Sequence, residues 1–138
     1  MAIPKTKREL ELIQECRVLV RKNPHLKKRK LNTIKDLDKR LYYIKVWVIT
    51  ESQPLFKLKD FEKRCYYGKN CYHLDHILPI SYGYHNNIPP EKIGSISNLR
   101  FIPSRENMSK GYKITEDSHK VLRKFKHKGD IYKKKNKK

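Results

Sequence analysis

Five side chains in the second half of the chain are of the types that could hold one divalent cation and cut a phosphodiester bond. Asp75 and His76 are adjacent inside an apolar run, Asn98 stands just before a second apolar run, and Asn107 is followed by Lys110. An acid, an imidazole, two carboxamides and an ammonium group are the parts that such a reaction needs. The Asp-His pair alone could instead be a buried, hydrogen-bonded pair, so its meaning depends on the elements that position it.

The sequence pattern predicts which elements carry these side chains. Residues 72–80 are typical of a strand and its continuation, and residues 98–102 of a second, short strand. The segment 82–97 between them is rich in glycine, proline, asparagine and histidine, and we expect a long loop there. After the second strand we expect a helix over 105–110, with Ser104 as its N-cap.

Helices are expected on both sides of this segment. Thr6 and Glu9 form a capping box at the start of a helix over 7–22. Apolar residues at helical spacing favour a second helix over 33–50, although that stretch is also rich in strand-forming residues. A further helix is expected over 115–127, before a lysine-rich end of the chain.

The charge of the chain indicates a polyanionic partner. Lys and Arg number 34 against 14 acidic residues, which gives a net charge of +20. Such a field attracts nucleic acid, acidic membrane surfaces or acidic proteins, and nine interleaved tyrosines favour nucleic acid over lipid. No apolar run is long enough to span a membrane, and no signal-peptide pattern is present, so we expect a cytoplasmic protein that is not secreted.

The order of these motifs resembles the HNH endonuclease family and its ββα-metal fold. The matching stretches are LDHILP with Asp75 and His76, SNLR with Asn98, and ENMSKG with Asn107 and Lys110. The spacing from Asn98 to Asn107 is similar to the family pattern as well. An isolated Asp-His dipeptide is a weak signal, whereas the three stretches in this order are a much more specific one. The resemblance covers about a third of the chain.

The resemblance implies a role for each of these residues. Asp75 and Asn107 would bind the cation, His76 would be the general base, and Asn98 would hold the loop that carries His76 through backbone hydrogen bonds. The chemistry agrees, because histidine has an ordinary pKa near neutral pH and a bound cation stabilises the charge that develops on phosphate. An oxygen-only donor pair suits Mg²⁺, or Mn²⁺ as an alternative.

Basic residues near the motif and in the basic stretch 21–30 are candidate phosphate contacts. Their positions in the chain do not rank them. These candidates are Lys110, Arg100, Arg105, Lys113, Lys28 and Arg29.

The cysteines depart from the pattern of the family, many members of which carry two Cys-x-x-Cys pairs around a zinc ion. Here Cys65 and Cys71 are more widely spaced and a second pair is missing, so no fourth ligand joins them and His73. We therefore do not expect a structural zinc. Three cysteines are also too few, and odd in number, for a disulfide scaffold, which favours a reducing cytosol.

These observations predict an α+β protein in three parts. Residues 1–60 would form a basic helical region, 61–115 the ββα-metal core, and 116–138 a basic helix and a disordered tail. The expected function is metal-dependent hydrolysis of duplex DNA by a monomer or homodimer, with the DNA held mainly through its phosphates. The resemblance also implies a phage or a mobile element as the origin of the protein. The alternative is a basic nucleic-acid-binding protein that keeps the fold without catalysis, and an RNA-directed nuclease ranks below DNA cleavage.

Overall fold

The computed structural model describes residues 5–65, 68 and 70–128 of the chain. The lysine-rich end beyond residue 128, for which we expect disorder, lies outside the described residues. Within the described part, no helix is both long and apolar enough to cross a membrane.

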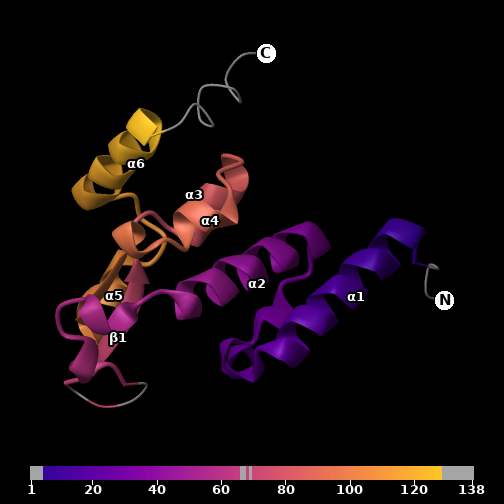
Figure 1. Cartoon of the computed structure of the whole chain (residues 1–138), viewed down its shortest axis with the longest axis horizontal. Helices are drawn as coiled ribbons and strands as arrows, with labels where there is room; N and C mark the ends of the chain where they lie inside the picture. The colour runs from indigo at the N-terminus through magenta and orange to yellow at the C-terminus, as the bar shows by residue number, and fades with distance from the viewer. Residues whose placement is uncertain (1–4, 66–67, 69, 129–138) are drawn as a thin grey trace.

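Two long helices form the N-terminal half, as the apolar spacing predicts. Helix α1 (Lys7–Lys22) begins with the expected capping box, in which the Thr6 hydroxyl accepts from the Glu9 amide and the Glu9 carboxylate accepts from the Thr6 amide. Helix α2 (Leu37–Ser52) confirms the helical interpretation of the ambiguous stretch, and it packs against α1 (Figure 1). Trp47 of this helix is buried in the core. Short 3-10 turns connect and follow these helices: η1 (Pro24–Arg29), η2 (Leu31–Thr33), η3 (Leu55–Lys57) and η4 (Phe61–Lys63).

The two predicted strands form a two-stranded antiparallel sheet, and a helix follows it directly. Strand β1 (Tyr72–His76) pairs with β2 (Leu99–Pro103), so that Asp75 lies opposite Arg100. Helix α5 (Ser104–Lys110) then packs against both strands. The α+β class and the strand–strand–helix order are therefore as predicted.

Ser104 differs from its predicted role. It is the first residue of α5 rather than its N-cap, and its side chain makes no capping bond. Its amide instead donates to the carbonyl of Cys71 at 2.8 Å, which ties the start of α5 to the residue before β1.

The prediction of a long loop over 82–97 is wrong, because this segment contains helical turns. They are α3 (Ile80–His85), α4 (Pro90–Ile93) and the 3-10 turn η5 (Ile96–Asn98). Prolines stand at the start of α3 and α4, where their fixed φ suits the first turn and their missing amide costs nothing. Ile88 and Ile93 are buried in the common core, so this segment is anchored on α2 by apolar contacts.

Helix α6 (Glu116–Lys128) is tied to the residue that follows β1. Ser118 at its first turn donates from its hydroxyl to the carbonyl of Ile77, just after β1, at 2.6 Å. Val121, Leu122 and Phe125 are buried on one side of this helix. Figure 1 shows α6 at the end of the molecule away from α1.

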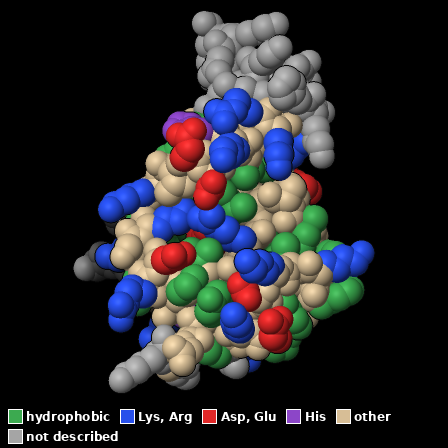
Figure 2. Space-filling view, turned by 90° about the vertical axis from the view of Figure 1, so that its left-hand side faces the viewer, with side chains coloured by type: hydrophobic (Ala, Val, Ile, Leu, Met, Phe, Trp, Pro, Cys, Tyr) green, Lys and Arg blue, Asp and Glu red, His purple; other side chains and the backbone are tan. Residues whose placement is uncertain are grey.

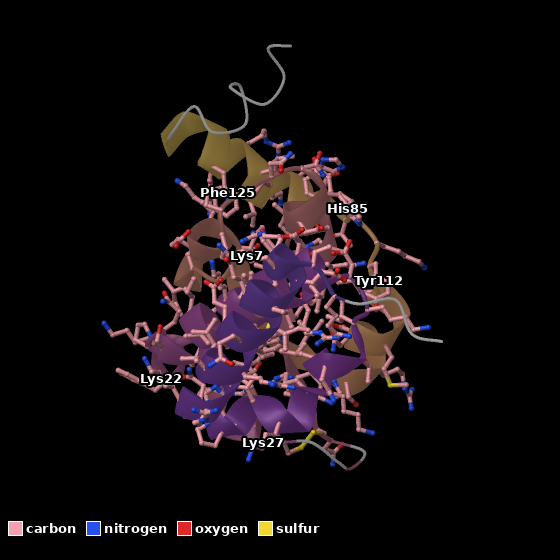
Figure 3. All side chains as sticks on the ribbon, turned by 90° about the vertical axis from the view of Figure 1, so that its right-hand side faces the viewer. Lys7, Lys22, Lys27, His85, Tyr112 and Phe125 are labelled. Atoms are coloured by element: carbon pink, nitrogen blue, oxygen red, sulfur yellow. A yellow bond between two sulfur atoms is a disulfide. The ribbon has the colours of Figure 1, made fainter. Side chains whose placement is uncertain are left out.

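A disulfide joins Cys65 and Cys71, which the cysteine count did not predict. It lies at the lower edge of Figure 3, immediately before β1. Cys71 is buried in the core beneath the start of α5. The third cysteine, Cys16 of α1, is a buried free thiol.

Candidate active site

Asn98 holds the segment between the strands in place through hydrogen bonds to its backbone. Its side chain is fully buried. The carboxamide oxygen accepts from the Leu78 amide at 2.7 Å, and the carboxamide nitrogen donates to the carbonyls of Leu78 and Ile93 at 3.1 and 2.8 Å. One side chain thus ties the end of β1 to α4, and it fixes the direction in which the chain leaves His76.

Asp75 lies on the face of β1 that is covered by α5. Its carboxylate is buried and accepts from two cationic groups, the Lys110 ammonium at 2.8 Å and the Arg100 guanidinium at 2.9 Å. The Lys110 ammonium also donates to the carbonyl of His76 at 2.8 Å. Arg100 reaches a second acid, Asp117 of α6. Lys110 and Arg100 therefore balance the charge of Asp75 in this structure.

The structure brings Asn107 close to His73, a residue that the sequence analysis considered only for zinc. His73 and Asp75 are two apart in β1 and so share one face of the strand. The amide nitrogen of Asn107 lies 3.3 Å from Nδ1 of His73. This contact uses the nitrogen of the carboxamide and not the oxygen that would bind a hard cation. The alternation of a strand was the signal that could have identified His73.

His76 faces the other way. Consecutive residues of a strand point to opposite faces, and the His76 ring lies against α2 instead of α5. It is buried edge-to-face on Trp47, with ring centroids 4.8 Å apart, and its Nε2 is 2.9 Å from the Thr50 hydroxyl. Asp75 and His76, adjacent in sequence, are therefore not brought together on one surface.

The contacts of Thr50 show which nitrogen of the His76 ring carries the proton. The Thr50 hydroxyl donates its single proton to the Val46 carbonyl at 2.7 Å, one turn back in α2. The contact with His76 then needs Nε2–H as its donor, which leaves the lone pair on Nδ1. Thr50 is thus the hydrogen-bond partner of His76 Nε2. No motif in the sequence connects Thr50 with His76.

Burial holds His76 in its neutral form. The pKa of His76 is lowered from 6.5 to about 3. Burial is the largest cause, the charges of Arg29 and Lys110 add to it, and those of Asp75 and Glu51 oppose it. A neutral imidazole is the form that a general base requires. The same burial covers the ring from solvent.

The depressed pKa of His76 predicts a pH-dependent stability. The unfolded chain binds a proton at this residue below about pH 6.5 whereas the folded chain does not, so stability is present above that pH and is lost as the pH falls towards 3. Between pH 6.5 and about pH 5 we expect a loss of about 2 kcal/mol in the free energy of unfolding, measured by urea denaturation in EDTA.

His76→Gln should remove most of this pH dependence, because glutamine does not titrate. His119→Gln is the matched control, since His119 is an exposed histidine of α6. An unchanged pH dependence in His76→Gln would show that the folded protein does not exclude the proton from this ring.

A second charged cluster lies beside His76. The Arg29 guanidinium stacks on the Trp47 ring, 3.5 Å from its centroid, and pairs with Glu51 at 3.3 Å. Arg64 binds the same carboxylate through both of its terminal nitrogens. Burial raises the pKa of Glu51, but its bonds and charge interaction with Arg64 outweigh this and hold the pKa below 4.5. This cluster joins the basic η1 turn to α2, next to the Trp47 ring that contacts His76.

The remaining candidate phosphate contacts are scattered. Arg105 and Lys113 are exposed on and after α5, Lys110 is buried against Asp75, and Arg100 is partly buried between two acids. The side chain of Lys28 lies outside the described part. The face shown in Figure 2 carries Lys and Arg side chains interleaved with acidic ones.

Comparison with known proteins identifies no relative of this chain. No family model, curated protein or solved structure matches it. The chemistry of the site must therefore be inferred from its own residues.

On the face of β1 that α5 covers, the side chains offer atoms of the types that bind a hard divalent cation. Asp75 supplies a carboxylate and Asn107 a carboxamide oxygen, with the His73 imidazole in contact with Asn107. A cation there would have to replace Lys110 or Arg100 at the Asp75 carboxylate. Among the described residues, no group of three His, Cys, Asp or Glu side chains forms a ready-made metal site.

Proposed function

We propose that this chain is a metal-dependent nuclease of the HNH type, acting on DNA. The observation that carries the proposal is the strand–strand–helix unit, in which Asn98 locks the connecting segment and Asp75 of β1 and Asn107 of α5 belong to one packed unit. The sequence order of these residues resembles that family, and the net charge of +20 suits a polyanionic substrate.

Asp75 and Asn107 would hold the cation, Mg²⁺ or Mn²⁺. When bound, it would supply Lewis-acid stabilisation of the charge that develops on the phosphate. Lys110, which pairs with Asp75 in this structure, would bind the substrate phosphate, and the exposed Arg105 and Lys113 would contact the nucleic-acid backbone.

His76 is the proposed general base, with Nδ1 as the atom that takes the proton from water. Thr50 orients the ring through Nε2. Because Trp47 covers the ring in this structure, the reaction requires the Trp47 side chain to move away while Thr50 keeps its bond to Nε2. His73 is the other imidazole at this unit, on the face of Asp75, and the experiment must compare the two.

Cleavage of supercoiled plasmid tests the proposal. We expect nicking with Mg²⁺ or Mn²⁺ and none in EDTA, and we expect His76→Ala to lower the rate by at least about 100-fold, the usual contribution of a general base. Binding of the same DNA by gel shift should survive in His76→Ala, and His119→Ala, on an exposed surface of α6, should cleave like the wild type.

The outcomes separate the possibilities. Loss of cleavage in His73→Ala but not in His76→Ala would move the role of base to His73. Absence of cleavage with every metal, together with salt-dependent DNA binding, would favour a non-catalytic nucleic-acid-binding protein. The covered His76 ring and the balanced charge of Asp75 are the observations that favour that second function.

A further inference from the structure

A basic pocket with two tyrosines lies beside the candidate active site. It has a cavity volume of about 410 Å³ and is lined by residues from η1, η2, the start of α2 and the segment after α5. We name it the Tyr43–Tyr112 pocket after its aromatic residues. Its basic residues are Arg29, Lys30, Lys35 and Lys39, and its single acid is Asp36, whose carboxylate caps α2 by accepting from the Lys39 amide.

Its aromatic rings are offered for stacking. Tyr112 is 79% exposed, at the right of the view in Figure 3, directly after Gly111 ends α5. Tyr43 is half-buried, and the Lys39 ammonium lies 5.8 Å from the centre of its ring. An exposed tyrosine has no packing role that explains its position, whereas a nucleic-acid base has a flat face that would cover it.

The lysines of the pocket are available to an anion. Within the described part of the chain, the ammonium groups of Lys30, Lys35 and Lys39 form no ion pair with an acidic side chain. Lys30 and Lys35 are also exposed. Three cations around an aromatic pocket match the two parts of a nucleotide, its phosphate and its base.

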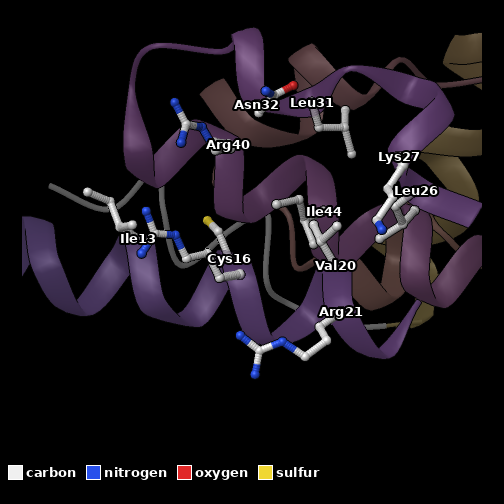
Figure 4. A pocket seen from close by; sticks show the side chains of 11 residues that line it. Ile13, Cys16, Val20, Arg21, Leu26, Lys27, Leu31, Asn32, Arg40 and Ile44 are labelled. Carbon is white, nitrogen blue, oxygen red and sulfur yellow. The ribbon is translucent and has the colours of Figure 1, made fainter. Parts of the chain in front are cut away.

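A larger hollow between α1 and α2, shown in Figure 4, lacks the second of these parts. Its volume is about 760 Å³, and its basic residues are Arg17, Arg21, Lys27 and Arg40. The rest of its lining is mainly aliphatic and includes no aromatic ring. It could attract phosphate but could not stack a base, so the smaller pocket carries the inference.

Contacts connect the Tyr43–Tyr112 pocket with the candidate active site from two sides. Arg29 lines the pocket and stacks on Trp47, whose ring contacts His76. Tyr112 follows Lys110, which binds Asp75, by two residues. A nucleotide in the pocket would therefore be held next to the strand that carries Asp75 and His76.

We propose that the Tyr43–Tyr112 pocket binds an unpaired nucleotide of a nucleic-acid strand, with its base against the tyrosines and its phosphate near the lysines. Bases in an intact duplex are stacked on each other and cannot occupy it. The pocket then favours a single strand, a duplex end or junction, or the locally unwound part of a negatively supercoiled plasmid over relaxed, fully paired duplex. That this nucleotide lies beside a cut bond rests on the proposed function; its binding does not.

Fluorescence anisotropy in EDTA tests the binding without any cleavage. The probes are a labelled short oligothymidylate, an abasic strand with the same number of phosphates, and a duplex of the same length. Wild-type protein should bind the oligothymidylate most tightly. Tyr112→Ala should weaken that binding by at least about fivefold, the effect of losing one stacked base, and leave binding of the abasic strand unchanged.

Matched variants isolate the cause. Tyr112→Phe keeps the ring and should restore binding, and Phe56→Ala, which removes another exposed aromatic ring outside the pocket, should have no effect. Lys35→Gln with Lys39→Gln should weaken binding of both strands more than Arg123→Gln with Lys124→Gln, two exposed cations of α6.

Three results would overturn the inference. They are equal binding of oligothymidylate by Tyr112→Ala and wild type, an equal loss for the abasic strand, and competition by free thymidine monophosphate as strong as that by the strand. If Tyr112 controls binding but the wild type never cuts DNA, the pocket stands and the nuclease proposal fails. If the wild type cuts DNA but Tyr112 has no effect, only the pocket proposal fails.

Discussion

Asn98→Ala should lower the free energy of unfolding by about 3–5 kcal/mol, because it leaves three buried backbone groups without a partner and opens a cavity. Those groups are the amide and carbonyl of Leu78 and the carbonyl of Ile93. Urea denaturation near neutral pH measures the loss. Asn98→Asp keeps the shape and the acceptor oxygen but places a buried carboxylate against two carbonyl oxygens, so it should be at least as damaging as alanine.

Asn86→Ala is the matched control for this change. Asn86 is a carboxamide in the same connecting segment, but it makes one side-chain bond, to the carbonyl of Tyr82 within α3, and it is only partly buried. Its loss should cost about 1 kcal/mol or less. Equal effects of the two alanine variants would contradict the locking role of Asn98 and weaken the case that the connecting segment holds the site in shape.

Lys110→Met should also destabilise the protein by about 3–5 kcal/mol, because it breaks a buried ion pair and leaves the Asp75 carboxylate with one cation instead of two. The side chains of both partners are more than nine-tenths buried, at 7% and 5% exposure. The double variant Asp75→Asn with Lys110→Met should lose less free energy of unfolding than the two single variants together. Each single variant leaves one buried charge without its partner, whereas the double variant removes both charges.

The exposed pair Arg8–Asp38 provides the control for this cycle. Its charged atoms are 3.6 Å apart and both side chains are mostly exposed, so Asp38→Asn should change stability by less than about 1 kcal/mol. A small effect of Lys110→Met, comparable with that of Asp38→Asn, would contradict the buried pair described here.

The Lys110→Met variant also allows a test of cation binding at Asp75 without an activity assay. If Mg²⁺ competes with Lys110 for the carboxylate, millimolar Mg²⁺ should raise the free energy of unfolding of Lys110→Met more than that of the wild type, because a ligand stabilises the form that binds it. An equal response of the two proteins would argue against Asp75 as a metal ligand.

Local patterns were sufficient for most of the regular elements. The capping box placed the start of α1, the apolar spacing of 37–48 favoured α2 over a strand, and Gly111, at φ 51°, ends α5 in a conformation that suits glycine. Each of these signals acts within a few residues, so the sequence carries it in full. The helical turns between the strands were missed, since their stability comes from Ile88 and Ile93 in the core and not from a local pattern.

The sequence by itself determined which chemical groups are present and their order along the chain, including the carboxamide of Asn98 that the resemblance assigned to the connecting segment. Only the tertiary structure decided which groups meet. It placed Lys110 and Arg100 on Asp75, His73 on Asn107, and Thr50 and Trp47 on His76. A strand sends neighbouring side chains to opposite faces, and the helix that covers each face comes from elsewhere in the chain. Burial of His76 and pairing of Asp75 therefore depend on packing between distant segments, which no local spacing encodes.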